Sequence, residues 1–426
     1  MMNRYEFIQH LQGLNVVKAR KKLAEEIKRP AVERRQEIVM YHSQHNPLYK
    51  EKTKGWTSGR FEDLPIMCKS DFQKPLDTII SDEYALKDLY VANTSGSSGH
   101  PFYYAKNKEA HAVVHAIIER LYSEHGLSVC DKQARFYGIP LKGRSKYIEQ
   151  VKDLLLNRAR FPIFDLSDDM MKTFLDRFRK NRFVYVYGYT SAIVLFCKYL
   201  IRHNIILKSV CPTLKACIVT SEVCTAEDRM VIEEAMGVRV INEYGCSEAG
   251  MVAFEDNEGI WRMVDDDSYY EVVDKDGNVL PEGEEGRILI TNYSNKALPF
   301  IRYEVGDMGV LSHDEKGGIL VKLTGRVSDV IKLPSGKIAG GLSFYYISRS
   351  IMEKKAMIKE FIVRQTKLDT FEFDIVGNIG PNSDLKQEFS RQMDKFLEPG
   401  LNAVINIVDH IDRPASGKIK HFYSEL

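Results

Sequence analysis

Two apolar, strand-like runs, each followed by a stretch with helical spacing, constrain the fold of this chain more than any other feature. The runs are Phe183-Val184-Tyr185-Val186-Tyr187 and Leu214-Lys215-Ala216-Cys217-Ile218-Val219-Thr220. This alternation predicts an α/β fold built on a mostly parallel sheet. Ligands of such sheets bind at the carboxyl ends of the strands. The turns after the two runs, which contain Gly188-Tyr189 and Ser221-Glu222, are therefore candidate walls of a binding site.

The segments on either side of this region have different patterns. Residues 4 to about 45 and about 107 to 125 have helical spacing. From about 260 to 325, short apolar runs alternate with Asp/Gly turns, which predicts β-hairpins and a small β-rich subdomain. Beyond residue 328, a predicted helix near 342 to 355 and predicted strands near 360 to 376 and 403 to 408 indicate a compact α+β unit.

We therefore predict two domains in an α/β chain. The large N-terminal domain, residues 1–327, consists of layered α/β subdomains and the β-rich subdomain, and the small α+β C-terminal domain is residues 328–426. A length of 426 residues is sufficient for both.

Composition excludes several classes of function. A formal net charge of +1 argues against a dedicated nucleic-acid binder, because no field of one sign would attract a polyanion. The longest apolar stretch, residues 191–197, is too short to span a bilayer, and the first residues lack a signal-peptide core. We expect a cytoplasmic protein without membrane insertion. The seven cysteines contain no C-x-x-C pair, so we expect reduced thiols and no zinc site.

The run Thr94-Ser95-Gly96-Ser97-Ser98-Gly99-His100-Pro101 follows an apparent strand end at Leu89-Tyr90-Val91. Glycines allow backbone N–H groups to converge on an anion, and the hydroxyl groups can donate to phosphate oxygens. The run lacks the Walker lysine and the dinucleotide glycine pattern, and an ordinary flexible loop is the alternative. The loop is a candidate polyphosphate site.

Further candidates follow in the order of the chain. In Asn242-Glu243-Tyr244-Gly245-Cys246-Ser247-Glu248, the aromatic ring could stack on a base and Glu248 offers a hard oxygen ligand for Mg²⁺, unless the segment is only a capped turn. The segment Arg302 to Asp307 ends in a carboxylate on a Gly-Asp turn, which is either an acceptor for ribose hydroxyls or a simple hairpin turn. Arg326 and Lys418 each place a cation next to a glycine.

These five motifs, taken in order, resemble the signature of the adenylate-forming superfamily of acyl-CoA synthetases, adenylation domains and luciferases. Within that superfamily, the sequence resembles the phenylacetate-CoA ligase branch most. This resemblance lies in residues 286–303, in Glu62-Asp63-Leu64-Pro65 and in Lys69-Ser70-Asp71-Phe72. The resemblance covers nearly the whole chain. It implies ATP-dependent activation of a carboxylic acid to an acyl-adenylate with release of pyrophosphate, followed by transfer to CoA. An aryl acid such as phenylacetate is one candidate substrate.

The resemblance also implies roles for individual residues and makes the C-terminal domain a mobile lid. Lys418 would bridge the carboxylate and the α-phosphate, Glu248 would hold Mg²⁺, and Ser328 would lie at the hinge. The predicted ATP-binding residues are Thr94, Ser95, Gly96, Ser97, Ser98, Gly99, Ser221, Glu222, Glu243, Tyr244, Gly245, Ser247, Asp307 and Arg326. The predicted acyl pocket contains Tyr137, Gly188 and Tyr189.

Three positions depart from the common pattern. His100 stands where a lysine usually closes the phosphate loop, and Ser328 replaces a charged hinge residue. The stretch Glu304-Val305-Gly306 differs from the basic residues that the branch typically has before the aspartate. Two alternatives to a CoA ligase therefore stay open. One is an AMP-forming ligase that passes the acyl group to an amine or a carrier protein, in surface-polysaccharide or secondary-metabolite biosynthesis. The other is a nucleotide-binding protein without turnover.

Overall fold

The computed structural model describes residues 3–94, 102–137, 144–163, 168–326, 330–336, 338–340, 347, 358–377, 384–411 and 422–426. Its helices are α1 (Arg4–Leu11), α2 (Val16–Glu26), α3 (Ala31–His45), α4 (Pro47–Lys52), α5 (Lys108–Glu124), α6 (Arg144–Leu155), α7 (Asp168–Lys180), α8 (Thr190–Arg202), α9 (Leu207–Val210), α10 (Ala226–Met236) and α12 (Leu385–Phe396). Short 3-10 turns occur at Phe61–Asp63, Lys69–Phe72, Leu76–Thr78 and Leu86–Asp88.

The strands are β1 (Leu89–Thr94), β2 (Phe102–Asn107), β3 (Gln133–Phe136), β4 (Arg158–Phe161), β5 (Tyr185–Tyr189), β6 (Ala216–Thr220), β7 (Arg239–Cys246), β8 (Gly250–Glu255), β9 (Trp261–Met263), β10 (Ser268–Val273), β11 (Glu285–Asn292), β12 (Tyr303–Asp314), β13 (Gly317–Arg326), β14 (Val330–Lys332), β15 (Ile338–Gly340), β16 (Ile358–Lys367), β17 (Thr370–Gly377), β18 (Asn402–Ile407) and β19 (Phe422–Ser424).

One large mixed sheet organises the part of the chain before residue 327. The described strands pair in the order β10-β11-β12-β13-β9-β8-β7-β6-β5-β3-β4. Strands β4, β3, β5, β6 and β7 are parallel, whereas the pairings from β7 to β8 and onward to β10 are antiparallel. The predicted α/β class is confirmed. The β-rich region, however, continues the parallel sheet instead of forming a separate one.

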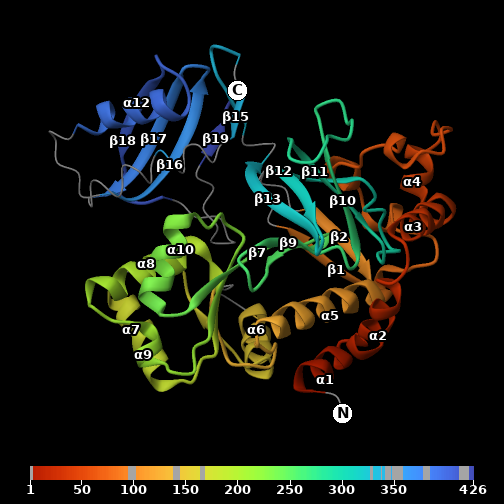
Figure 1. Cartoon of the computed structure of the whole chain (residues 1–426), viewed down its shortest axis with the longest axis horizontal. Coiled ribbons are helices and arrows are strands. Elements are labelled where there is room, and N and C mark those ends of the chain that lie inside the picture. Colours follow the sequence, from red (N-terminus) through yellow and green to blue (C-terminus); the bar gives the residue numbers. More distant parts are fainter. Residues whose placement is uncertain are drawn as a thin grey trace.

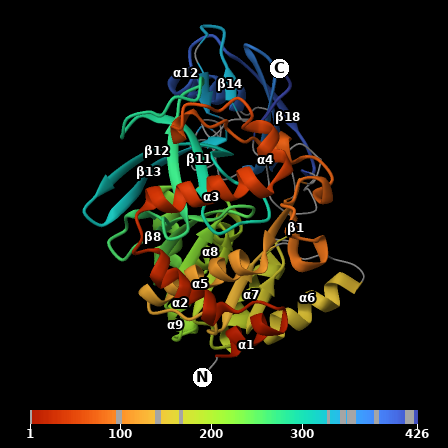
Figure 2. The same ribbon diagram turned by 90° about the vertical axis from the view of Figure 1, so that its right-hand side faces the viewer.

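Helices cover both faces of the parallel strands, as Figure 1 and the rotated view of Figure 2 show. Helices α7, α8 and α10 bury their apolar sides against one face, in a core that includes Phe174, Phe196 and Ile232. Helices α1, α2 and α5 cover the other face, where Ile117 packs near Ile218 and Ile241. This burial is the main source of stability of a three-layer arrangement.

Local sequence fixes where α10 begins and ends. The Thr225 side chain accepts a hydrogen bond from the Asp228 backbone N–H, and the Asp228 side chain accepts in return from the Thr225 backbone, which completes a capping box. Gly237 follows the last turn with a φ of 65°, a left-handed conformation that favours glycine. The helix is therefore set between β6 and β7 by its own end residues.

The C-terminal segment has its own sheet and core. Strands β18, β17, β16 and β19 form a four-stranded sheet with α12 on it, and the buried residues include Phe361, Phe373 and Phe389. The predicted strands near 360–376 and 403–408 are confirmed, and α12 was not predicted. The predicted helix near 342–355 lies almost wholly outside the described residues. The proposed boundary between residues 327 and 328 also lies outside them.

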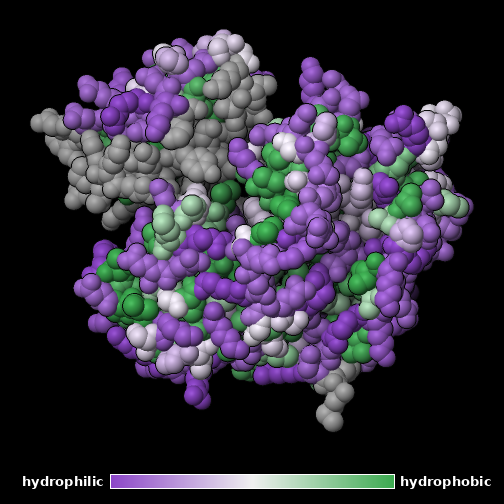
Figure 3. All heavy atoms as spheres, in the orientation of Figure 1, coloured by the Kyte–Doolittle hydropathy of each residue, from purple (hydrophilic) through white to green (hydrophobic). Residues whose placement is uncertain are grey.

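Hydrophilic residues dominate the part of the surface that Figure 3 shows in colour. The face drawn in Figure 3 is mainly hydrophilic, with hydrophobic residues in separate small groups. Among the helices that the structure describes, none has the length and apolar character required to cross a bilayer. All seven cysteines are free, as expected.

Candidate active site

The carboxyl ends of the parallel strands bring several predicted residues to one edge of the sheet. Tyr137 follows β3, Gly188 and Tyr189 end β5, Ser221 and Glu222 follow β6, and the segment from Glu243 ends β7. Register confirms the alignment, because Tyr189 pairs with Thr220 and Thr220 pairs with Glu243. This edge is where ligands of parallel sheets bind.

A hydrogen bond joins two of the predicted nucleotide motifs. The Tyr244 hydroxyl donates to Asp307 Oδ2 at 2.7 Å. Asp307 in turn is the direct cross-strand partner of Arg326, on β12 and β13. Tyr244, Asp307 and the backbone of Arg326 are thus neighbours, although 63 residues separate the first two.

The local conformation at Asp307 differs from the sequence expectation. Asp307 lies inside β12 and not on a Gly-Asp turn. Gly306 precedes it with a φ of +86°, and the pairing of β12 with β13 shifts between Met308 and Gly309. Such an irregularity re-aims side chains without ending the strand.

Glu248 is held by a partner that the sequence did not reveal. It is 8% exposed, and its Oε1 accepts a hydrogen bond of 2.8 Å from the Tyr303 hydroxyl. The bond orients the carboxylate within the edge that also carries Tyr244. A buried, oriented carboxylate fits the way proteins bind Mg²⁺, which takes one or two carboxylates together with substrate phosphates. Groups of three or more potential metal ligands are absent from the described part of the chain, so a dedicated multi-ligand metal site is not evident there.

Lys106, on β2, lies next to the same turn. Its Nζ donates to the Ser247 carbonyl oxygen at 3.0 Å, and the side chain is only 4% exposed. Burial lowers the pKa of Lys106 to about 8, although Cys246 and Glu248 oppose the shift. The Ser247 side chain itself is exposed.

Glu243 precedes Tyr244 on β7, and its side chain lies among aromatic residues. Its Oε1 accepts a hydrogen bond of 2.7 Å from the Tyr187 hydroxyl. Burial raises the pKa of Glu243, and hydrogen bonds from Tyr187 and Thr220 partly offset this. Tyr137 stacks on Tyr187 with ring centroids 5.6 Å apart and leans on Tyr189 at 4.5 Å.

Ser221 and Glu222 form a strained corner after β6. Ser221 has a φ of 67°, which a residue other than glycine adopts at a cost of about 1 to 3 kcal/mol. The Glu222 carboxylate accepts from the Ser191 backbone N–H at 2.8 Å, at the first turn of α8. An acidic group at a helix N-terminus is electrostatically favourable. The corner is therefore fixed in position beside the strand ends.

The two predicted site glycines that lie among the described residues, Gly188 and Gly245, have different local surroundings. A Cβ at Gly188 would lie 2.4 Å from the Phe136 carbonyl oxygen, so close packing of β5 on β3 requires glycine there. A Cβ at Gly245 would meet its nearest atom at 3.7 Å, and Gly245 is exposed. Packing alone does not require a glycine at Gly245, and the space beside it is open.

Several predicted residues cannot be placed in the site. Thr94 ends β1 and pairs with Phe102, which begins β2. The phosphate-loop residues Ser95–Gly99, the hinge residue Ser328 and the proposed catalytic Lys418 lie outside the described residues. Their roles stay predictions.

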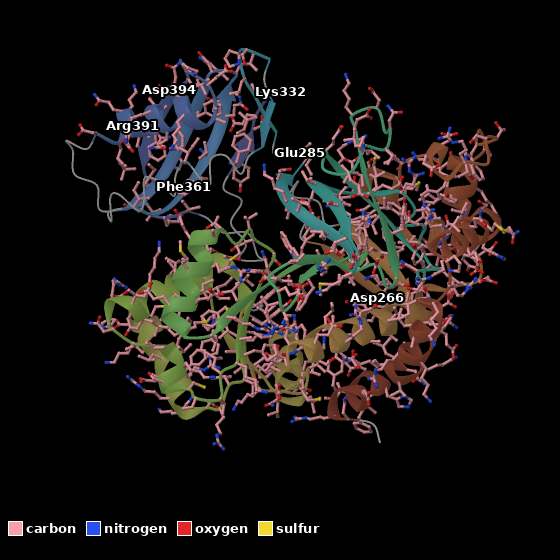
Figure 4. The ribbon with its side chains drawn as sticks, viewed as in Figure 1. Asp266, Glu285, Lys332, Phe361, Arg391 and Asp394 are labelled. Carbon is pink, nitrogen blue, oxygen red and sulfur yellow. The ribbon has the colours of Figure 1, made fainter. Side chains whose placement is uncertain are left out.

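A surface pocket elsewhere does not involve the predicted site. Residues of α5, β8, β9, the start of β13 and the adjoining loops line it. Ion pairs join some of these residues, among them Arg120 with Asp266 at 2.6 Å and Arg262 with Asp256 at 2.9 Å. Figure 4 labels Asp266 well away from Arg391 and Asp394 of the C-terminal segment. None of the predicted ATP-binding residues among those described lines this pocket.

Comparison with known proteins agrees with the family that the motifs indicate. No family model matches the chain. It is similar to Protein CapK of Staphylococcus aureus, with 23% identity over 316 residues that cover 70% of this chain and 68% of that protein. It is also similar to phenylacetate-coenzyme A ligase of Aromatoleum evansii, with 24% identity over 231 residues, 49% of this chain and 50% of the ligase. This second match spans about half of the ligase's length.

A solved structure has the same fold over almost the whole chain. It is 2-hydroxyisobutyryl-CoA ligase in the postadenylation state in complex with 2-HIB-AMP. The TM-score is 0.70 at 17% identity, and the match covers 93% of this chain and 90% of that one. At this identity the likeness shows the fold, and the order of the motifs adds the evidence for family.

Proposed function

Because the chain belongs to the adenylate-forming superfamily, we propose that it is an AMP-forming ligase that activates a carboxylic acid with ATP and transfers the acyl group to CoA. The observation that carries the proposal is the contact of Tyr244 with Asp307, the cross-strand partner of Arg326. The meeting of residues from three separate motifs at one sheet edge supports a shared role in binding one ligand.

The first step forms a mixed anhydride. A carboxylate oxygen attacks the α-phosphorus of ATP, the bond to the β-phosphate oxygen breaks, and pyrophosphate leaves. Asp307 and Arg326 would hold the ribose, while Tyr244 and the corner at Ser221 and Glu222 would frame the adenine. A buried and preorganised site stabilises the charge that builds on the phosphate oxygens.

Glu248 is the residue that would hold Mg²⁺ in this reaction. The ion, when bound, would neutralise charge on the phosphates of ATP. Tyr303 keeps the Glu248 carboxylate oriented by donating to its Oε1. Lys418 would supply the second positive charge between the carboxylate and the α-phosphate.

The second step exchanges AMP for a thiol. The thiol sulfur of CoA attacks the acyl carbon, a thioester forms, and AMP leaves with the electron pair of the broken C–O bond. In our proposal the C-terminal domain turns at Ser328, which withdraws Lys418 and admits the thiol. One rotation would thus serve both half-reactions.

Lys418→Ala tests this assignment, with Lys420→Ala as the matched control two residues away. We expect Lys418→Ala to lower the rate of pyrophosphate release from ATP and acid by at least about a hundredfold, because the transition state loses a contact with a positive charge. Transfer from a supplied acyl-adenylate to CoA should persist, and Lys420→Ala should retain both half-reactions. Equal loss of both half-reactions in Lys418→Ala would contradict the role. An absence of pyrophosphate release from a broad acid panel by the natural chain would contradict the function.

A further inference from the structure

A group of positively charged and aromatic side chains lies inside the sheet edge, beneath the predicted acyl pocket. Its members come from β3, β4, β5 and α5 and face the side of the sheet that α5 covers. They are Arg135, Arg158, His111, His115, Tyr187 and Tyr137.

Arg135 is held by aromatic faces rather than by an anion. It is the direct register partner of Tyr187, and its guanidinium carbon lies 4.7 Å from the Tyr187 ring centroid and 5.1 Å from that of Tyr137. Stacking of this kind covers the flat face of the guanidinium and leaves its N–H donors at the edge. Within the described residues, Arg135 makes no hydrogen bond or ion pair. Glu243 lies near enough to feel its charge, but the Glu243 carboxylate is bonded to Tyr187.

Arg158 adds a second cation to the same interior. It pairs in register with Gln133, two residues before Arg135, and its Nε is buried with no partner among the described residues. Burial and the charge of Arg135 lower the pKa of Arg158 to about 10, so it is still protonated at pH 7. The positive charge of Arg135 therefore acts against that of Arg158, although Asp153 partly offsets this effect. An anion bound between the two guanidinium groups would relieve the repulsion.

The neighbouring histidines are polar but uncharged. His111 and His115 lie one helical turn apart on α5, with ring centroids 4.8 Å apart. Burial lowers their pKa values to about 3 and about 4, so both are neutral at pH 7. The His111 Nδ1 is buried without a partner in the described part of the chain, and His115 shares a hydrogen bond with Tyr5. The interior therefore offers donors and acceptors as well as positive charge.

The depth of Arg135 separates it from the reacting carboxylate. Arg135 lies in register with Tyr187, and through β6 with Ile241 of β7. Cys246, the last residue of β7, lies five residues beyond Ile241, which corresponds to about 16 Å along an extended strand. In the proposed reaction the α-phosphate and the carboxylate that attacks it would lie near Ser247 and Glu248. An anion that contacts Arg135 would thus be at the far end of the acyl group.

We propose that the acid activated by this protein carries a second anionic group, which Arg135 and Arg158 bind at the end of the acyl pocket opposite the reacting carboxylate. This inference rests on the proposed function and narrows its substrate class. A wholly apolar acid would leave the two guanidinium groups without an anionic ligand. An aryl acid remains compatible when its ring bears an acidic substituent, because Tyr137 and Tyr187 offer a stacking surface.

Matched pairs of acids test the proposal on the full-length protein. One pair is glutarate and pentanoate, and the other is 4-carboxyphenylacetate and 4-methylphenylacetate. Pyrophosphate release is measured for each acid with ATP and Mg²⁺, and the ratio of kcat/KM for the diacid over its monoacid partner is the readout. We expect ratios of at least about tenfold in the natural chain, since a site built around a charge rejects an analogue that lacks the partner.

Arg135→Gln should lower that ratio by at least about tenfold, because the amide keeps a donor but loses the charge. Arg202→Gln is the control, since Arg202 is an exposed residue of α8 that pairs with Asp168 on the far side of the sheet. It should leave the ratio unchanged. Isothermal titration of the natural chain with the diacid and the monoacid gives a second measurement that does not depend on the folding of a variant.

Each outcome decides between the alternatives. Pyrophosphate release from the monoacids with no preference for the diacids overturns this inference and leaves the proposed function intact. Equal loss of both activities in Arg135→Gln, with an unchanged ratio, assigns Arg135 a structural role and also overturns the inference. An absence of pyrophosphate release with these four acids and with the broad acid panel overturns the proposed function, and the inference with it.

Discussion

Replacing Lys106 with methionine should remove a specific pH dependence from the stability of the protein. Lys106 is 4% exposed, and burial lowers its pKa from the usual 10.5 to about 8. Methionine is unbranched and of similar length, so the change removes the titrating group with little loss of packing. The groups that act on the charge of Lys106 are Cys246, Glu248 and Asp267.

The magnitude follows from linkage between protonation and folding. Below pH 8 both the folded and the unfolded chain carry the proton, and the folded state bears the full cost of burying the charge. Between pH 8 and 10.5 the folded state has lost the proton while the unfolded state still holds it, so stability rises with pH. A shift from 10.5 to about 8 corresponds to about 3 kcal/mol, most of it gained between pH 7 and pH 10.

Urea unfolding at pH 7 and pH 10 measures this difference. Both tryptophans, Trp56 and Trp261, lie in the N-terminal part with Lys106, so their fluorescence reports the relevant transition. The free energy of unfolding of the natural chain, minus that of Lys106→Met, should increase by about 2 to 3 kcal/mol from pH 7 to pH 10. Other titrating groups act in both proteins and cancel. Parallel pH profiles for the two proteins would refute the argument.

Two further substitutions probe the site. Tyr303→Phe removes the hydroxyl that donates to Glu248, so the free energy of unfolding should fall by about 1.5 to 3 kcal/mol and the KM for Mg-ATP should rise. Urea titration measures the first effect and steady-state kinetics the second. An unchanged KM would contradict a role of Glu248 in Mg²⁺ binding. Gly188→Ala should lower the free energy of unfolding by about 1 to 3 kcal/mol, because its Cβ would meet the Phe136 carbonyl oxygen. Gly245→Ala is the control and should change this free energy by no more than about 0.5 kcal/mol in the same urea assay. Equal effects of the two substitutions would contradict the packing argument.

Much of the fold could be predicted because it depends on local pattern. The helical spacing of residues 107–125 matches α5, Lys108–Glu124, and the apolar run 214–220 contains β6, Ala216–Thr220. The pairing of β13 with β9, which joins the β-rich region to the parallel strands, involves residues far apart in the chain. Periodicity identifies strands but not distant partners, so the continuous sheet was not predicted.

The site was predicted as a set of motifs and not as a set of contacts. Motif order identified Tyr244 and Asp307, but the hydrogen bond between them is a property of the folded sheet. Lys106 lies 141 residues before Ser247, and nothing in its surrounding sequence marks it as buried. Arg135 was missed for a similar reason, because an arginine on a short strand usually points to solvent, and only its contacts with the Tyr137 and Tyr187 rings show that it packs against aromatic residues.

The change from parallel to antiparallel pairing at β7 explains how one sheet can serve a two-part ligand. On one side of β7, the parallel strands carry Tyr189 and are followed by Tyr137, which in our proposal face the acyl group. On the other side, the antiparallel strands reach β12 and β13, which carry Asp307 and Arg326, the proposed ribose-binding residues. Arg326 ends β13, and the proposed hinge residue Ser328 follows two positions later. A rotation at Ser328 would therefore begin just beyond the ribose contacts, so Lys418 could move while the adenylate stays bound to the sheet.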